Sequence, residues 1–371
     1  MKLTIDRGAL LKALAHAQGV VEKRNTIPIL ANVLLKAEKT ALHLSATDME
    51  LEIVETVRAD VAQTGATTAP AAMLYDIVRK LPEGSDVELD CPAGKDQLTI
   101  KAGRSHFKLG CLPVDDFPQM AGGELPHSIK LSVDSLIHLI DRTKFAMSTE
   151  ETRYYLNGIY LHEAENEGVK VLRAVATDGH RLARFEMPLP DGAKGMPGVI
   201  IPRKAIGELR KLADEAADEI RISLSETKIR FAFDHVILTS KLIDGTFPDY
   251  QRVIPQGNNK IVELDPKAFT HAIDRVSTIS DGKSRAVKIT LQSKQMTLSA
   301  SSPESGSATE ELEVNGDTDI EIGFNAKYLL DITSQIEGEG CRLVLADPAS
   351  PTIIQDNSDP SSLYVLMPLR V

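Results

Sequence analysis

The sequence lacks the features that would assign it to a membrane or to a secretory route. No apolar run in its 371 residues approaches the roughly 18 that a membrane helix needs. The segment from Met1 to Arg7 carries charges where a signal peptide has an apolar stretch. The three cysteines, Cys91, Cys111 and Cys341, are odd in number and have no motif spacing. We therefore expect a cytosolic protein whose cysteines are reduced and serve as small core residues.

Motifs of catalysis are absent as well. Neither His-Glu-x-x-His nor Cys-x-x-Cys nor Gly-x-Ser-x-Gly occurs. Residues 281–284, Asp-Gly-Lys-Ser, resemble the end of a phosphate loop, but Ser277 stands where its first glycine should be. In the stretch 176–183, Asp178 and His180 could bind a metal or form an acid–base pair. A tight turn between strands explains Asp-Gly equally well, so an enzyme centred on this pair is only an alternative.

A strand followed by a helix occurs three times along the chain. The copies begin near residues 3, 131 and 262, and His-x-Ile-Asp-Arg recurs at 138 and 271. Each copy has a second helix with apolar residues at i and i+3, namely Leu74/Ile77, Ile206/Leu209 and Leu329/Ile332. Phe-Pro closes two copies, at 117–118 and 247–248. We expect an α+β fold of three similar domains, each with two helices on antiparallel strands, at 1–126, 127–256 and 257–371.

An overall excess of positive charge is also missing, since the net charge is −11. Taken alone, this argues against a nucleic-acid partner. The six candidate helices are 7–16, 71–81, 133–147, 203–212, 266–279 and 325–336. Together they carry +7, which leaves −18 for the rest of the chain. If the helices line one surface, that surface attracts phosphates. Alternatively, strands and loops simply hold more acidic residues.

Several stretches resemble the beta sliding clamps of bacterial DNA polymerase III. They are 153–158 (Arg-Tyr-Tyr-Leu-Asn-Gly), 176–182 (Ala-Thr-Asp-Gly-His-Arg-Leu), 201–204 (Ile-Pro-Arg-Lys), 239–242 with 247–250, 321–325 and 364–371. The resemblance spans the chain in family order. It implies the clamp fold, with two chains closing head to tail into a ring around double-stranded DNA, without sequence specificity. It also implies no catalysis, cofactor or metal. The implied partners are a second copy, the replicative polymerase, the clamp loader and other proteins with a clamp-binding motif.

The resemblance also implies DNA-contacting residues. They are Arg24, Tyr154 and Tyr155, to which we add Arg79, Arg203 and Lys204 from the candidate basic helices. Ala72 and Glu150 stand where relatives can carry Arg and Gln, so neither is claimed. Alternatively, one tyrosine ring packs in a core while the other covers a strand. An oligomeric scaffold that never meets DNA is a rival reading that the basic helices disfavour.

A partner-peptide groove is implied between the second and third domains. Its residues are Leu156, Thr177, Gly179, His180, Arg181, Leu182, Pro248, Arg252, Val253, Tyr328, Val365, Leu366, Met367, Pro368, Leu369 and Arg370. Apolar side chains with a few cationic and backbone groups suit a short peptide. Alternatively, the C-terminal run is a simple last strand and His180 is a satisfied turn residue.

A dimer interface is expected on an edge strand. Phe107 and Leu109 alternate there, and an exposed apolar edge invites pairing. The resemblance sets this strand against the helix that ends near Thr278 and Ile279.

Overall fold

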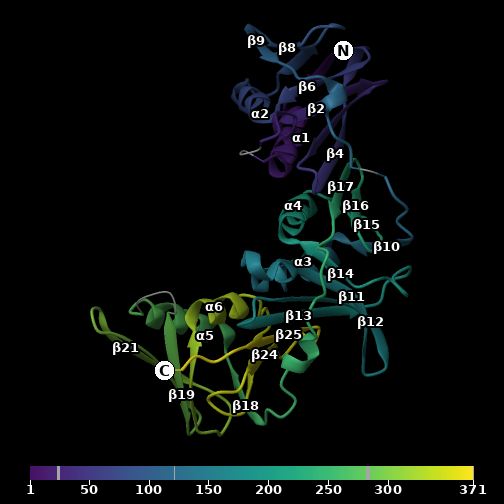
Figure 1. Ribbon diagram of the computed structural model, residues 1–371. Helices are drawn as coiled ribbons and strands as arrows, with labels where there is room; N and C mark the ends of the chain where they lie inside the picture. The colour runs from purple at the N-terminus through teal and green to yellow at the C-terminus, as the bar shows by residue number, and fades with distance from the viewer. Residues whose placement is uncertain (23–25, 121, 281–284, 371) are drawn as a thin grey trace. The chain divides into compact units, whose positions relative to one another are not determined.

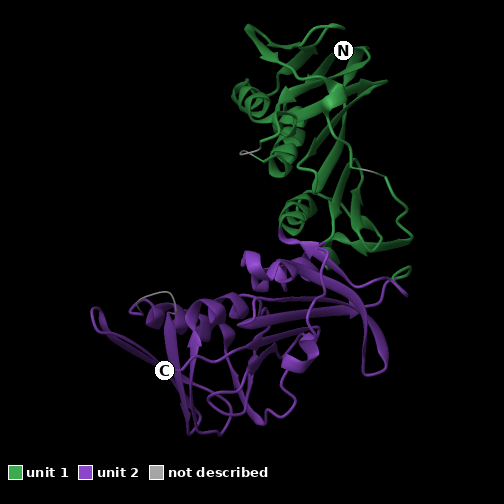
Figure 2. Cartoon of the chain, in the orientation of Figure 1, with its two compact units in different colours: residues 1–136, 191–193, 204–242 green, residues 137–190, 194–203, 243–371 purple. Residues whose placement is uncertain are grey.

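The computed structural model describes residues 1–22, 26–120, 122–280 and 285–370. Two compact units divide the chain, unit 1 with residues 1–136, 191–193 and 204–242, and unit 2 with 137–190, 194–203 and 243–371 (Figure 2). Arg24 and the phosphate-loop-like residues 281–284 lie outside the described residues.

Unit 1 combines strands with helices (Figure 1). In chain order it contains β1 (Lys2–Asp6), α1 (Arg7–Val20), a 3-10 turn (Pro28–Ala31), β2 (Asn32–Glu38), β3 (Ala41–Thr47), β4 (Leu51–Arg58), β5 (Asp60–Gln63), β6 (Gly65–Pro70), α2 (Ala71–Lys80), β7 (Asp86–Asp90), β8 (Gln97–Ala102), β9 (Ser105–Gly110), a 3-10 turn (Val114–Asp116), β10 (His127–Ser132), α4 (Arg203–Ala213), β15 (Glu219–Leu224), β16 (Lys228–Phe233) and β17 (Val236–Lys241). Helix α3 (Val133–Asp141) begins in unit 1 and continues into unit 2, and Arg203 of α4 belongs to unit 2.

Unit 2 holds the remaining elements. They are 3-10 turns at Lys144–Ala146 and Glu151–Leu156, β11 (Gly158–Asn166), β12 (Val169–Thr177), β13 (Arg181–Pro188), β14 (Val199–Pro202), a 3-10 turn (Tyr250–Val253), β18 (Lys260–Leu264), α5 (Pro266–Ser277), β19 (Ala286–Gln292), β20 (Gln295–Ser302), β21 (Gly306–Glu313), β22 (Ile320–Asn325), α6 (Ala326–Thr333), β23 (Cys341–Leu345), β24 (Thr352–Asp356) and β25 (Ser362–Leu366).

Each unit is built on an eight-stranded sheet, and the two sheets share one strand order. In unit 1 the order is β10-β15-β16-β17-β4-β3-β2-β6. In unit 2 it is β18-β23-β24-β25-β13-β12-β11-β14. Each strand of one sheet has a counterpart at the same place in the other. For example, β10 and β18 both precede the first helix of a repeat. A smaller sheet completes each unit, β5-β1-β7-β8-β9 in unit 1 and β21-β20-β19-β22 in unit 2.

The predicted repeat of strand and helix is confirmed by β1–α1, β10–α3 and β18–α5, with α2, α4 and α6 as the second helices. Local chemistry fixes where helices begin. Asp6 accepts the Ala9 amide at 2.8 Å, Asp265 accepts the Ala268 amide at 2.8 Å, and Asn325 caps α6. Each helix then buries an apolar face, as with Leu10, Leu14 and Val20 of α1.

Two predicted helices end earlier than expected. Residues 133–147 were predicted as one helix, but α3 ends at Asp141 and a 3-10 turn follows at Lys144–Ala146. The Thr143 hydroxyl bonds the Leu139 carbonyl at 2.7 Å, and this competes with continuation of the helix. The predicted helix 325–336 ends at Thr333, after which the chain tightens into i→i+3 bonds.

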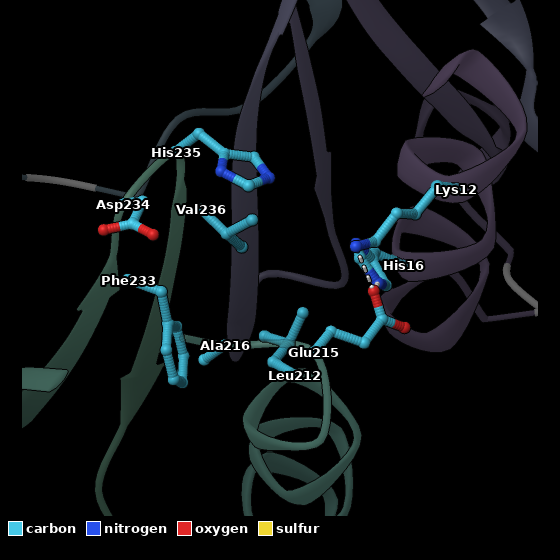
Figure 3. A pocket seen from close by; sticks show the side chains of 9 residues that line it. All are labelled: Lys12, His16, Leu212, Glu215, Ala216, Phe233, Asp234, His235 and Val236. Carbon is cyan, nitrogen blue, oxygen red and sulfur yellow. Dashed lines mark ion pairs between the residues drawn. The ribbon is translucent and has the colours of Figure 1, made fainter. Parts of the chain in front are cut away.

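A polar cluster lies in unit 1 between α1, the segment after α4 and the β16–β17 turn (Figure 3). Nδ1 of His16 lies 2.7 Å from Oε2 of Glu55, and its Nε2 lies 3.3 Å from Oε2 of Glu215. Lys12 also pairs with Glu215, at 2.7 Å. The adjacent hollow has a volume of only about 30 Å³, so it has room for little more than water.

Within the described ranges, no helix has both the length and the apolar content that a membrane crossing requires. The three cysteines are unbridged; Cys91 and Cys341 are buried, as expected of small core residues, whereas Cys111 is only half-buried.

Candidate functional site

The turn between β12 and β13 is held by its own side chains. The Thr177 hydroxyl donates to the Arg181 carbonyl at 2.7 Å and accepts the Gly179 amide at 3.1 Å. Oδ1 of Asp178 accepts the amides of His180 at 2.9 Å and Arg181 at 3.0 Å. Gly179 has a φ of +87°, which glycine adopts without strain. Asp178 thus builds the turn, and this favours the turn interpretation over an acid–base pair.

The side chain of Arg181 anchors this turn to α6. It is 7% exposed, and its Nε lies 3.1 Å from Oδ2 of Asp178. Its Nη1 donates to Asp331 and its Nη2 to the Phe145 carbonyl at 2.6 Å. The guanidinium also lies 4.3 Å from the centre of the Tyr328 ring. Arg181 therefore positions the backbone around it, since protein groups already bind its charge.

Sequence reasoning missed two of these partners. Asp331 lies three residues after Tyr328 on α6, so the helical spacing of the two was a usable signal. Phe145 contributes a backbone carbonyl, which no residue pattern reveals.

An open hollow of about 440 Å³ lies beside the turn in unit 2. His180 and Tyr328 stack along it, with ring centres 6.2 Å apart and planes at 24°. Arg203 and Lys327 line it as cations and Glu150 as an anion. Among the described residues, the Arg203 guanidinium makes one long contact, 3.5 Å, to the Met147 carbonyl. This hollow can receive polar and charged groups next to an aromatic surface.

The floor of the candidate groove is apolar. Leu156, Leu182 and Val365 belong to one buried cluster with Phe247 and Tyr250. Leu182 and Val365 are direct partners across β13 and β25. The structure thus brings together in one buried cluster three residues that the sequence analysis listed for the peptide groove.

The rim is exposed where the floor is buried. Pro248 is exposed, and Val253 and Met367 are 51% and 41% exposed, large values for apolar side chains. Arg252 pairs with Asp249 at 2.8 Å, but its side chain is 83% exposed. Exposed apolar surface of this kind is typical of interaction sites.

The C-terminal segment is partly core and partly surface. The Val365 and Leu366 side chains are buried, which matches the alternative of a simple last strand for these two residues. Beyond β25, the Met367 amide donates to the His180 carbonyl at 2.9 Å. The Leu369 amide donates to a second strand, β22, at the Gly323 carbonyl at 2.8 Å. These bonds fix the tail in place, while Met367, Pro368, Leu369 and Arg370 keep exposed or half-exposed side chains.

The predicted DNA contacts occupy different environments. Tyr154 is 53% exposed, whereas Tyr155 packs on the groove cluster, and the rings meet edge-on at 5.8 Å. Only Tyr154 therefore presents a free ring face. Arg79 is 55% exposed and pairs with Asp76 one turn earlier in α2. Such an exposed pair is weak and leaves the guanidinium accessible to a phosphate.

Lys204 is bound by unit 1 itself. Its ammonium donates to the Val20 carbonyl at 2.8 Å, to Asp48 at 2.5 Å and to Glu22 at 3.1 Å. Burial lowers the pKa of Lys204, but the bonds to Asp48 and Glu22 outweigh it and raise the pKa. Two carboxylates neutralise this charge, so the geometry favours Arg203 over Lys204 as a phosphate contact.

The two smaller sheets each end in an open edge. β9 is the last strand of one sheet, with Phe107 37% exposed and Leu109 half-exposed. β21 is the last strand of the other sheet, next to α5. Thr278 is exposed and Ile279 half-exposed just after α5. In the part of the chain that the structure describes, each of these strands pairs on one side only, so its other side offers backbone groups to another strand.

Comparison of the sequence and the fold with known proteins shows which family the chain belongs to. Models of the N-terminal, central and C-terminal domains of the DNA polymerase III beta subunit match residues 1–121, 130–249 and 251–370. The beta sliding clamp of Caulobacter vibrioides is 54% identical over all of both chains, and that of Escherichia coli is 37% identical, again over all of both.

Solved structures agree in fold. A C. crescentus beta sliding clamp with bound polyethylene glycol is 54% identical and superposes with a TM-score of 0.96. A Bartonella birtlesii sliding clamp bound to griselimycin is 50% identical, with a TM-score of 0.97. Both comparisons cover all of each chain.

Three similar α+β domains with antiparallel sheets define the class of DNA sliding clamps. The chain belongs to the family of the DNA polymerase III beta subunit, the bacterial beta sliding clamps.

Proposed function

We propose that two copies of the chain close head to tail into a ring that encircles double-stranded DNA and has no catalytic activity of its own. Each copy contributes domains 1–126, 127–256 and 257–371. The ring would act in the cytoplasm as a processivity factor that keeps the replicative polymerase on its template. Holding by enclosure needs no readout of base sequence, because base contacts carry sequence information and topology does not.

The observation that best supports the ring is the strand order of the smaller sheets. β9 is the third strand after α2, the second helix of its repeat, just as β17 is the third strand after α4. β21 is the third strand after α5, the first helix of its repeat, just as β4 is the third strand after α1. Because β17 and β4 pair in unit 1, β9 and the partner's β21 are the corresponding pair. Their union would give β5-β1-β7-β8-β9-β21-β20-β19-β22, which, apart from the additional edge strand β5, repeats the order of the two large sheets. An interface between two different surfaces closes into a ring when the rotation permits.

The groove of unit 2 would tether partners. A buried floor of Leu156 and Leu182 with the exposed rim of Val253 and Met367 suits the apolar anchors of a short peptide. The turn at His180 and the hollow beside it would bind the polar part. The polymerase, the clamp loader and other proteins with a clamp-binding motif would share this groove.

Direct DNA contact would be weak and would come from a few groups. Arg203, Tyr154 and Arg79 are accessible, so they would touch phosphates and sugars without reading sequence. Arg24 joins them as a prediction from the resemblance alone.

Retention on DNA after loading tests the proposal. The protein is loaded on nicked circles, the circles are isolated by gel filtration, and half are linearised. We expect it to stay on circles and to leave linear DNA. Capping both ends of the linear DNA with bulky protein blocks should restore retention. Equal retention on circular and open linear DNA would contradict enclosure.

A further inference from the structure

Unit 1 contains a second copy of the turn that frames the groove in unit 2. The Thr47 hydroxyl donates to the Leu51 carbonyl at 2.9 Å and accepts the Met49 amide at 2.9 Å. Oδ1 of Asp48 accepts the amides of Glu50 at 2.9 Å and Leu51 at 2.7 Å. The same bonds, in the same order, hold the turn between β12 and β13. The two turns are therefore structural counterparts.

The neighbouring strand repeats as well. The Lys241 amide donates to the Glu50 carbonyl at 2.8 Å, as the Met367 amide donates to the His180 carbonyl at 2.9 Å. Lys241 therefore takes the position of Met367, at the end of the strand that borders the turn. The Phe-Pro segment at 117–118 corresponds to the one that flanks the groove in unit 2, and both phenylalanines are buried.

These counterparts surround a hollow of about 220 Å³ within unit 1. Met49, Pro118 and Met120 give it apolar walls, and Lys228 and Lys241 line it as cations. Met49 is 45% exposed and has a φ of +76°, where the other turn has glycine at +87°. A long side chain in this left-handed conformation is unusual, and here it supplies part of the wall.

The charges on this wall favour an anionic occupant. Lys228 and Lys241 are direct partners across β16 and β17, and like charges opposite each other repel. Glu50 pairs with Lys241 at 2.8 Å, but the two side chains are 71% and 45% exposed, so the pair is easily exchanged. The Glu52 carboxylate accepts the Met120 amide at 3.3 Å and also feels the charges of Lys228 and Arg230, so it offsets part of the positive charge on this wall. A carboxylate between the two ammonium groups would relieve their repulsion.

We propose that this hollow is a second docking surface, which binds an acidic peptide segment carrying an apolar side chain. Two methionines adapt to apolar groups of different shape, and this favours a peptide over a bare phosphate. The comparison of this hollow with a peptide groove rests on the function proposed for unit 2. The residues that line the hollow and their charges are observed in unit 1 alone.

A photo-crosslinking peptide tests the proposal on the full-length protein. The probe is a fluorescein-labelled peptide of alternating leucine and glutamate with one benzophenone side chain. Its companion has lysine in place of glutamate. We expect the acidic probe to bind in fluorescence anisotropy and to label Met49 or Met120, as mapped by mass spectrometry, while the basic probe does neither.

Variants separate the two grooves. The double substitution Lys228→Glu/Lys241→Glu should weaken the acidic probe about tenfold or more, as expected for two reversed surface charges. Lys101→Glu/Lys130→Glu changes the same charge at exposed sites elsewhere in unit 1 and should leave binding unchanged. Met49→Gly should weaken binding without lowering the melting temperature, because glycine relieves the left-handed backbone.

Three outcomes would overturn the inference. The first is absence of binding by the acidic probe, and the second is labelling confined to residues of unit 2. The third is binding of a short DNA oligonucleotide at Lys228 and Lys241 that Met49→Gly does not change, which would make this a phosphate site. A Met367→Ala variant tells the proposals apart, since it should impair only a peptide held in the unit 2 groove.

Discussion

Nδ1 of His16 lies 2.7 Å from Oε2 of Glu55, and both side chains are at least nine-tenths buried. The imidazole is flanked on its other side by Glu215, and Lys12 and His235 lie within ion-pair distance of one or the other carboxylate. Burial disfavours the imidazolium, but the bond and charge of Glu55, followed by those of Glu215, raise the pKa of His16. α1 is thereby joined to β4 and to the segment after α4 inside unit 1.

This arrangement predicts a pH-dependent stability. A raised pKa in the folded state means that the stabilisation is fully present below the unfolded value of about 6.5 and is lost as the pH rises through the folded pKa. We expect the melting temperature of the wild type to fall over this range relative to His16→Gln. Thermal unfolding at several pH values measures the difference. A constant difference between the two proteins at all pH values would contradict the prediction.

Removal of Met367 through Val371 should abolish binding of a short polymerase-derived peptide. The protein should stay folded and dimeric, because β25 ends at Leu366 and its core residues remain. A single Met367→Ala or Val253→Ala change should cost about 2 kcal/mol of binding free energy if it removes a central contact. Val169→Ala, at a residue 62% exposed elsewhere in unit 2, is the control. Unfolding of the truncated chain would make the tail merely structural.

Loss of Arg181 should lower the stability of unit 2 directly. It should weaken partner binding only as a consequence of that lost stability. Arg181→Met leaves the carboxylates of Asp178 and Asp331 without their cation, which should destabilise unit 2 by about 3 kcal/mol. Arg181→Lys should rescue little, because an ammonium cannot make the guanidinium's forked contacts. Urea denaturation followed by peptide titration distinguishes the two effects. Lost binding at unchanged stability would show that the side chain contacts the peptide directly.

Charging the open edges should separate the dimer. Leu109→Asp on β9, or Ile279→Asp after α5, sets a carboxylate into the proposed interface and should yield monomers in sedimentation velocity. Ile261→Asp is a matched control, since Ile261 is 48% exposed on β18, the edge strand of the large sheet in unit 2. A fully dimeric Leu109→Asp protein would count against this geometry.

Weak direct DNA binding should depend on Arg203 more than on Lys204. Each phosphate contact contributes about 0.9 to the slope of log affinity against log salt, so Arg203→Ala should reduce this slope by about one. Lys204→Ala should change the slope less, since Asp48 and Glu22 already bind its ammonium. Titrations of duplex DNA at several salt concentrations give both slopes. Equal changes would mean that DNA displaces the two carboxylates.

The sequence by itself determined the repeated architecture. Hydrophobic periodicity, caps such as Asp6 and Asp265, and the turn chemistry of Thr177 and Asp178 are local properties, so they can be read from neighbouring residues. The predicted C-terminal ends of α3 and α6 lie beyond the observed ones, because local hydrogen bonds such as that of the Thr143 hydroxyl compete with continuation of the helix.

Only the tertiary structure decided which of these local pieces meet. β4 pairs with β17 from nearly two hundred residues away, and this pairing creates the hollow that Met49 and Lys241 line. The same folding neutralised Lys204 with Asp48 and bound Arg181 to Asp331, although the sequence analysis assigned these two cations to DNA and to a partner peptide. Charge and burial depend on what the fold brings within a few ångströms, and composition holds no record of those distances.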